Sequence, residues 1–388
     1  MFSQRTNWKL AQNRFTQALA EARAGGVKVL DLTLSNPTRA GLHFAEQEIL
    51  GALASPRALH YDPQPKGLRE AREAVAQYYS EDHAVGLDAE QIVLTTSTSE
   101  GYSFVFRLLC NAGDELLVPK PSYPLFEFLA DLHDVRLTPY ELIYDHGWQI
   151  DFPSLEKNVT ARTRGVVVVH PNNPTGSHVQ DAEIKTLNSF CREHELAVIA
   201  DEVFLDYGFD GVEHSSFAGN RDVLTFTLSG LSKIAALPQM KVAWIVTSGP
   251  REATGEAIGR LDVIADTYLS MNAPLQWATA ALLRQRKNLQ AQLLDRVKGN
   301  LTELDRQLSA QKSCQRLNAE GGWYAVLRVP VTRTDEELAI ELLHEKSVLV
   351  HPGHFYDFPS DGYLILSLIT PRPEFADGTR AILEKLSA

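Results

Sequence analysis

Two unbroken apolar runs on either side of a helical segment constrain the fold more than any other feature of this chain. Residues 165–170 read Gly-Val-Val-Val-Val-His, and residues 196–200 form a second apolar run. The intervening residues 181–195 are predicted to form a helix. Continuous β-branched runs are typical of strands buried on both faces of a parallel sheet. The sequence therefore predicts an α/β fold around a mostly parallel sheet.

Length and composition narrow the class of protein. The 388 residues suffice for one large domain and a smaller one, and 44% hydrophobic and 22% charged residues are ordinary for a globular protein. A net charge of −12 without a basic run argues against a nucleic-acid partner. Residues 1–15 lack the apolar core of a signal peptide, and no window approaches the ~20 apolar residues of a membrane span. We therefore expect no membrane association.

The cysteines bear on the cellular compartment. Cys110, Cys191 and Cys314 are widely spaced and form no CxxC pair. This usage is typical of a reducing compartment and predicts neither a disulfide framework nor a metal site. We expect a cytoplasmic protein.

Periodicity and turn residues predict the remaining elements. A helix is expected at residues 3–24, ended by Gly25 and Gly26, and a strand at 27–34. A long helical segment is expected at 278–309. Further strands are expected at 92–96, 115–118, 321–327 and 363–369, and further helices at 68–79, 101–110, 336–346 and 375–386.

Polar residues follow several of these strands. The turn Ser97-Thr98-Ser99 lies between a strand and a helix, where free backbone N–H groups and the helix dipole form an anion site. Helix capping by Thr98 or Ser99 is an alternative that is compatible with anion binding. Asp201 ends the run at 196–200, and ligands of open α/β sheets bind outside such strand ends. A capping or loop role for Asp201 remains open.

Lys233 lies between two β-prone runs, beside the small residues Ser229, Gly230 and Ser232. An amine in such surroundings can lose solvent, lower its pKa and form a Schiff base with a carbonyl. The alternative is an ordinary surface lysine in a loop.

Taken in order, these segments resemble the class I/II aminotransferases, which hold pyridoxal 5′-phosphate (PLP). The match includes Gly-Leu-Ser-Lys at 230–233 and Pro-Asn-Asn-Pro-Thr-Gly at 171–176, and it covers nearly the whole chain. The resemblance implies the fold of type I PLP enzymes: a mostly parallel central sheet with helices on both faces and a smaller α/β domain. Residues 41–280 would form the large PLP-binding domain, 281–388 the small domain, and 1–40 a segment packed with it. The resemblance also implies a homodimer.

The resemblance further implies roles for single residues. Lys233 would hold PLP as an internal aldimine and act as base and then as acid, and Asp201 would pair with the ring nitrogen. Asn173 would donate to the ring hydroxyl oxygen, and Tyr123, presented by the stiff loop 119–124, would stack on the ring; a core tyrosine is the alternative. The other residues expected to bind the cofactor are Ser97, Thr98, Ser99, Ser229, Ser232, Lys241 and, from the neighbouring subunit, Tyr61.

The sequence departs from the family at three informative positions. Lys241 replaces a phosphate-binding arginine, so the charge remains without the bidentate fork. Phe204 replaces a tyrosine, and either Tyr207 compensates or Asn173 acts alone. Ile365 replaces the arginine that clamps the substrate carboxylate. Arg372 is a candidate for that clamp or a solvated loop arginine, and Asn36 and Arg39 are further substrate-binding candidates; for Asn36 a plain turn role is the alternative.

The implied activity is transfer of an amino group from an amino acid to a 2-oxo acid. A PLP-dependent carbon–sulfur β-lyase is an alternative activity, and a PLP-binding regulatory domain is an alternative of another class. Trp148, Trp323 and Tyr324 could line an apolar pocket for a bulky side chain, or belong to the core.

Overall fold

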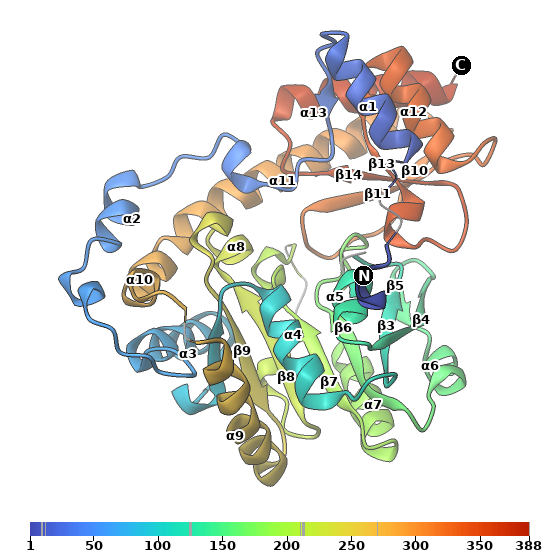
Figure 1. Cartoon of the computed structure of the whole chain (residues 1–388). Coiled ribbons are helices and arrows are strands. Elements are labelled where there is room, and N and C mark those ends of the chain that lie inside the picture. The colour runs from blue at the N-terminus through green and yellow to red at the C-terminus, as the bar shows by residue number, and fades with distance from the viewer. Residues whose placement is uncertain are drawn as a thin grey trace.

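The computed structural model describes residues 1–8, 11, 13–123, 126–209, 211, 214–269 and 271–387. Its centre is an eight-stranded sheet in the order β2-β9-β8-β7-β6-β3-β4-β5 (Figure 1). Its strands are β2 (Ile92–Thr95), β3 (Glu115–Lys120), β4 (Arg136–Tyr144), β5 (Trp148–Ile150), β6 (Thr163–Val169), β7 (Ala197–Asp201), β8 (Thr225–Gly230) and β9 (Ala243–Ser248). The neighbours from β4 to β8 are parallel, and β9 and β5 are antiparallel to their partners. The predicted mostly parallel sheet is confirmed.

The apolar run at 165–169 shows why the central strands carry no polar alternation. Val167 and Val169 pack into one core cluster, whereas Val166 and Val168 pack into another. Both faces of the sheet are covered by helices. They are α3 (Arg69–His83), α4 (Thr98–Leu109), α5 (Phe126–Leu132), α6 (Phe152–Asn158), α7 (Asp181–Glu193), α9 (Arg251–Tyr268) and α10 (Ala273–Arg284).

A small antiparallel sheet lies beside the large one, in the order β10-β11-β14-β13. Its strands are β10 (Gln315–Arg316), β11 (Tyr324–Arg328), β13 (His351–Pro352) and β14 (Tyr363–Ser367), with α12 (Asp335–Lys346) and α13 (Arg372–Ser387) around them. The long α11 (Arg286–Leu308) connects the two sheets (Figure 1). Two further short helices are α2 (Glu46–Ala52) and α8 (Leu231–Ile234).

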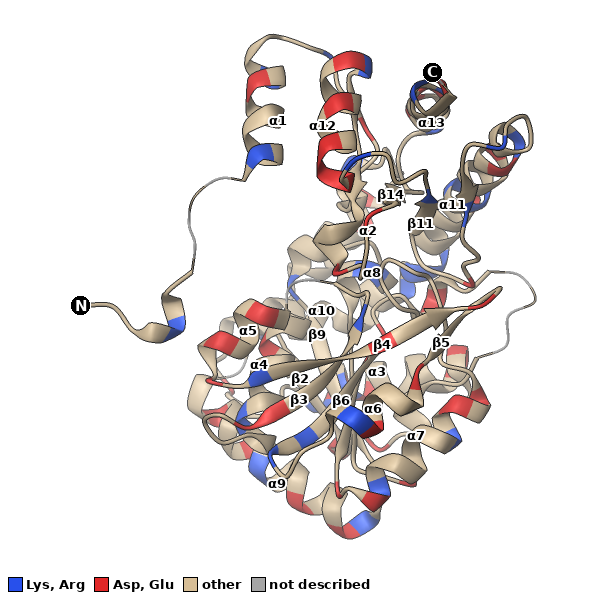
Figure 2. Cartoon of the chain, turned by 90° about the vertical axis from the view of Figure 1, so that its right-hand side faces the viewer, with Lys and Arg blue, Asp and Glu red and all other residues tan. Residues whose placement is uncertain are grey.

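From residue 14 onward, the N-terminal segment packs beside the small sheet and contributes one strand to a separate two-stranded sheet. Helix α1 (Arg14–Ala24) packs against α12, and β1 (Leu30–Asp31) pairs in parallel with β12 (Val348–Leu349). Figure 2 shows α1 and α12 side by side, with acidic and basic residues spread over the outer helices.

Several predicted boundaries were wrong. The helix expected from residue 3 is a short 3-10 helix, η1 (Gln4–Thr6), followed by α1 from Arg14, which Asn13 caps by accepting from Thr16 N at 2.7 Å. The residues before the cap instead contact α5, where Trp8 Nε1 donates to Asp131 at 2.8 Å. Residues 9, 10 and 12 lie outside the described residues.

Two further predictions require correction. The strand expected at 27–34 is limited to the two residues of β1, because only they pair with β12. The helical segment expected at 278–309 is part of two helices, α10 and α11, that meet at Gln285. Within the described residues, no helix combines the length and the apolar character needed to cross a membrane.

Candidate active site

The parallel strands of the large sheet bring the candidate residues to one edge. Tyr123 follows β3, Asn173 follows β6, Asp201 ends β7 and Lys233 follows β8. These strands run in the same direction, so their carboxyl ends meet there. This is the edge at which open α/β sheets bind ligands.

Lys233 lies on α8, a single helical turn that begins where β8 ends. Its side chain is half-buried, and Nζ lies 5.0 Å from the ring centroid of Trp323 and 5.5 Å from that of Phe204. Burial lowers the pKa of Lys233 to about 8, although the charge of Asp201 opposes the shift. A substantial fraction of the amine is therefore neutral near pH 8, as a nucleophile or base requires.

Asp201 is held by two hydrogen bonds at the end of β7. Its Oδ2 accepts from the Tyr102 hydroxyl at 3.0 Å, and its Oδ1 accepts from Val203 N at 3.2 Å. Burial raises the pKa of Asp201 to about 6, and these bonds and Lys233 limit the rise. The side chain thus stays mostly ionised at neutral pH and can pair with a cation.

Tyr102 was missed by the sequence analysis. It lies one turn into α4, four residues after Thr98, so its side chain shares the helix face that covers the strand end. The spacing of a helix that starts at residue 98 would have revealed it.

Asn173 and Tyr123 lie on loops that are tied together. Asn172 Nδ2 donates to Pro121 O at 3.0 Å, and Ser122 Oγ donates to Asn172 Oδ1 at 3.1 Å. Asn173 is 8% exposed, and its Oδ1 has no hydrogen-bond partner among the described residues. Tyr123 is 44% exposed, unlike a core tyrosine. The neighbouring Pro124, at the end of the predicted stiff loop, lies outside the described residues.

The predicted anion site lies at the N-terminus of α4. The cap of this helix is Ser97, whose Oγ accepts from Glu100 N at 3.1 Å, so the capping predicted for Thr98 or Ser99 was wrong. Thr98 and Ser99 form the first turn and are half-buried. Their position leaves the first-turn N–H groups directed beyond the strand end, where an anion is stabilised.

The remaining predicted cofactor residues differ in exposure. Ser229 is buried, and its hydroxyl donates to Glu202 O at 3.3 Å, whereas Ser232 is half-buried. Lys241 is exposed and has a left-handed backbone conformation with φ 51°. Tyr61 is 79% exposed on a cleft of roughly 420 Å³.

The structure shows how Tyr207 is used. Its hydroxyl donates to the backbone carbonyl of Lys233 at 2.6 Å. Phe204 is buried, with its ring 5.1 Å from that of Trp323. Tyr207 therefore supports the backbone beneath the amine and does not direct its hydroxyl as the replaced tyrosine was expected to.

Among the described residues, no hydrogen bond joins Asn36, Arg39 or Arg372 to Lys233. Asn36 caps the 3-10 helix η2 (Pro37–Arg39), with Oδ1 accepting from Thr38 N at 3.0 Å, and Arg39 is exposed. Arg372 donates to the backbone and side-chain oxygens of Asp295 on α11, each at 2.9 Å. Acting as a carboxylate clamp would require Arg372 to leave Asp295.

Ile365 and the three predicted pocket aromatics belong to one core cluster. Ile365 is 1% exposed and pairs with Val326 of β11. Trp148, Trp323 and Tyr324 are buried in the same cluster. Trp323 is the member that also lies close to the Lys233 amine.

Comparison with known proteins identifies the family. Residues 27–368 match the family model for aminotransferases of class I and II. Glutamate-pyruvate aminotransferase AlaA of Haemophilus influenzae is 28% identical over 354 residues, covering 88% of this chain and 87% of the relative. Alanine aminotransferase of Mycobacterium tuberculosis is 29% identical over 366 residues, covering 90% of this chain and 83% of the relative.

Solved structures agree with the fold. Alanine aminotransferase from Pyrococcus furiosus superposes with a TM-score of 0.91 at 23% identity, and each chain is covered in full. An Escherichia coli aminotransferase superposes with a TM-score of 0.87 at 24% identity, covering 100% of this chain and 98% of the other.

Members of this family depend on PLP, and the residues at the sheet edge fit that cofactor. The half-buried amine of Lys233 suits its aldehyde, and the carboxylate of Asp201 suits a protonated ring nitrogen. Asn173 is buried at the same edge, and its amide NH2 group suits donation to the ring hydroxyl oxygen. The first turn of α4 suits a phosphate. The chain belongs to the class I and II aminotransferases, and it is a PLP-dependent enzyme that transfers amino groups between amino acids and 2-oxo acids.

Proposed function

We propose that Lys233 and Asp201 are the two catalytic residues of this aminotransferase. The single observation that carries the assignment is the half-buried amine of Lys233, whose pKa is lowered to about 8, at the strand edge that also presents Asp201. PLP, when bound, withdraws electrons from the substrate α-carbon and so makes its proton removable. The chain's own residues then have to hold the ring, move the proton and keep out water.

Each residue has a role that follows from its surroundings. The neutral Lys233 amine accepts the α-proton and returns it, because its pKa lies near the working pH. Asp201, oriented by Tyr102, keeps the ring nitrogen protonated. Asn173 binds the ring hydroxyl oxygen and Tyr123 stacks on the ring, while Ser97, Thr98, Ser99, Ser229, Ser232 and Lys241 surround the phosphate. The rings of Phe204 and Trp323 limit the access of water to Lys233.

For the substrates, we propose alanine and glutamate as amino donors, with pyruvate and the 2-oxo acid of glutamate as acceptors. Support comes from the relatives named glutamate-pyruvate and alanine aminotransferase, which this chain matches over most of their length. Asn36, Arg39 and Arg372 remain the proposed contacts of the substrate carboxylates.

We also propose a homodimer in which Tyr61 reaches the phosphate of the neighbouring subunit. Leu50, Leu59 and Tyr61 are 62%, 88% and 79% exposed, which is an unusual concentration of exposed apolar side chains along α2 and the segment after it. Arg57 stacks on Trp277 at 3.3 Å in the cleft that Tyr61 lines. Burial against a second copy would cover this surface.

Two further assignments complete the proposal. The three cysteines are free thiols, which supports a cytoplasmic location.

We propose residues 41–280 as the large domain and 281–388 as the small domain with 1–40 packed on it. This division is supported by the pairing of β1 with β12 and by the packing of α1 on α12.

Reductive trapping tests the central assignment. The holoenzyme is treated with borohydride, digested, and the cofactor-bearing peptide is identified by mass spectrometry. We expect a single modified residue, Lys233. A cofactor fixed to any other lysine would overturn the proposed site while leaving the family membership intact.

A further inference from the structure

The one-turn helix that carries Lys233 depends on contacts from other elements. Helix α8 has only four residues, and so short a helix is marginal without tertiary support. Two side chains bind the carbonyls of its last two residues. The Tyr207 hydroxyl donates to Lys233 O at 2.6 Å, and Gln290 Nε2 donates to Ile234 O at 2.9 Å. The backbone that carries the amine is thus fixed at two consecutive points.

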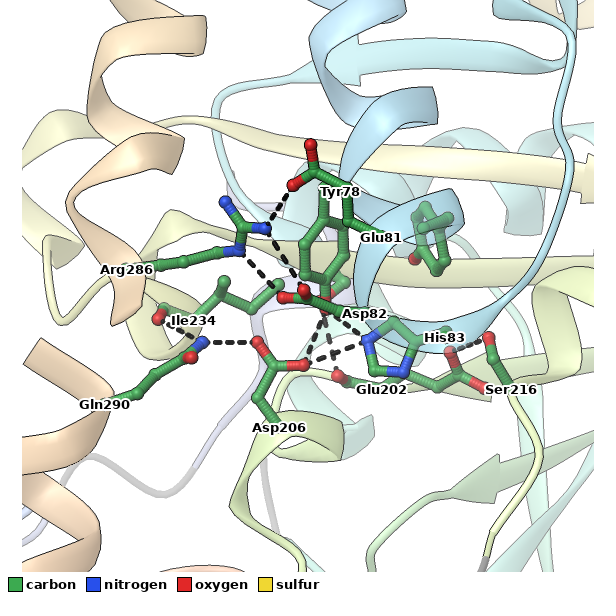
Figure 3. Close-up of polar contacts among 12 residues, drawn as sticks. Tyr78, Glu81, Asp82, His83, Glu202, Asp206, Ser216, Ile234, Arg286 and Gln290 are labelled. Carbon is green, nitrogen blue, oxygen red and sulfur yellow. Dashed lines mark hydrogen bonds and ion pairs between the residues drawn. The ribbon is translucent and has the colours of Figure 1, made fainter. Parts of the chain in front are cut away.

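One of the two donors, Gln290, is held by the buried carboxylate of Asp206 (Figure 3). Its Oδ2 accepts from Gln290 Nε2 at 2.5 Å, and its Oδ1 lies 2.9 Å from both Tyr78 OH and His83 Nε2. Asp206 immediately precedes Tyr207 in the 3-10 helix η5 (Leu205–Tyr207), so the short segment that supplies the Tyr207 hydroxyl is also anchored through Asp206. The side chain of Asp206 is 5% exposed.

Helix α11, which supplies Gln290, is itself tied to α3 one turn earlier. Arg286 Nε lies 2.8 Å from Asp82 Oδ2, and Arg286 Nη2 lies 2.8 Å from Glu81 Oε2. Figure 3 shows Arg286 and Gln290 approaching from the same helix, one toward α3 and one toward Ile234. Gln290 therefore projects from a rigid base.

Tyr207 also contacts the aromatic wall of the site. Its ring centroid lies 5.0 Å from that of Trp323, and the Trp323 centroid lies 5.0 Å from Lys233 Nζ. One tyrosine thus supports both the backbone of the lysine and the ring beside its amine.

We propose that Tyr207 and Gln290 are positioning residues that hold the Lys233 amine in its reactive place. The inference rests on the proposed role of Lys233. The amine ends a flexible side chain, so its location depends on where the backbone of α8 lies. A displacement of about 1 Å in a catalytic group can cost roughly a hundredfold in rate.

The test compares two variants with two matched controls in the holoenzyme. Tyr207→Phe removes only the hydroxyl, and Tyr140→Phe is its control, because the buried Tyr140 hydroxyl also donates to a backbone carbonyl, Val167 O, at 2.9 Å. Gln290→Met removes the second anchor. Its control is Gln307→Met on the same helix, since Gln307 Nε2 likewise binds a carbonyl, Ala376 O, at 3.0 Å and a glutamate.

Four quantities are measured: kcat, KM, the midpoint of the pH titration of bound-cofactor absorbance, and the unfolding temperature. We expect Tyr207→Phe and Gln290→Met to lower kcat by roughly tenfold with a smaller change in KM. We also expect them to move the absorbance midpoint by about half a pH unit or more, because the environment of the lysine nitrogen changes. The controls should lower only the unfolding temperature.

Equal effects of each variant and its control on kcat and on the midpoint would overturn the inference, whatever the unfolding temperatures. If one variant fails to fold, the other pair decides. The wild-type trapping experiment separates the two failures. Cofactor fixed to another lysine would contradict the proposed role of Lys233. Cofactor trapped on Lys233, together with unaffected Tyr207 and Gln290 variants, would contradict only the positioning role.

Discussion

The Tyr102 hydroxyl donates a 3.0 Å hydrogen bond to Asp201 Oδ2, which joins the first turns of α4 to the end of β7. This bond favours the charged form of a carboxyl group whose pKa burial raises to about 6. The same helix therefore contributes its N-terminus to the predicted anion site and its tyrosine to the carboxylate that is expected to face the ring nitrogen.

Replacing Tyr102 by phenylalanine should raise the pKa of Asp201 further, because one donor to the charged form is lost. We expect kcat/KM to fall several-fold at pH 7 and its acidic limb to move to higher pH. A pH–rate profile from pH 5 to 9 measures both. A profile superimposable on that of the wild type would contradict this role for Tyr102.

The ionised side chain of Asp201 should lower the free energy of unfolding of the cofactor-free protein. Its folded pKa of about 6 lies above the ordinary value of 3.8, so the cost is absent below the lower value, grows with pH, and is complete above the higher one. We expect Asp201→Asn to raise the free energy of unfolding by up to about 3 kcal/mol at pH 8 and little at pH 4. Denaturant titrations at the two pH values measure this, while turnover should be lost.

His83 should stabilise the fold with the opposite pH dependence. Burial disfavours its charged form, but the hydrogen bond and charge of Asp206 outweigh burial and raise the pKa of His83. Its contribution is complete below the unfolded pKa of about 6.5 and is lost as pH rises through the folded value. We expect His83→Gln to cost more stability at pH 6 than at pH 8, as denaturant titrations at the two pH values would measure. An equal loss at both pH values would refute the charged pair.

A substitution at Gly176 tests how closely the Asn173 turn packs against the segment that leads into the small sheet. It has φ +70°, and a Cβ there would lie 2.5 Å from Gly321 O. We expect Gly176→Ala to cost about 2–4 kcal/mol and to raise the KM for the amino donor. Gly26→Ala is the control, because Gly26 has φ +71° with nothing within 4 Å of the added atom. Equal losses would show that backbone strain alone is responsible.

Arg372→Ala decides between a substrate clamp and a helix contact. The guanidinium pairs with Asp295, and its side chain is 52% exposed, so stability should change by less than about 1 kcal/mol. If Arg372 leaves Asp295 to bind the substrate, KM should rise at least tenfold, and Asp295→Ala should not raise it. An unchanged KM for Arg372→Ala would show that Arg372 contacts α11 and does not bind the substrate.

The sequence predicted those parts of the fold that depend on local pattern. The valines at 166–169 predicted a doubly covered strand because alternate side chains face the two cores. The motif order also predicted which strand ends would meet, since parallel strands share one edge.

Features that depend on distant partners could not be predicted. Nothing near Tyr207 shows that its hydroxyl meets Lys233 O, and Gln290 looks like one polar residue in a charged helix. The length of β1 is set by β12, at the other end of the chain. The cap of α4 was misassigned because three consecutive hydroxyl residues are equally good caps in isolation, and only the backbone of Ser97, with φ −163°, selects it.

The pairing of Leu30 and Asp31 with Val348 and Leu349 has a consequence for biosynthesis. A ribosome synthesises β1 long before its partner strand, because residues 32–347 lie between them. Until the later segment has been synthesised, the apolar side of α1, with Phe15 and Ala18, lacks the surface that covers it in the folded protein. We therefore expect the nascent chain to expose this apolar surface until residues 348 and 349 have been synthesised, which favours aggregation during that interval.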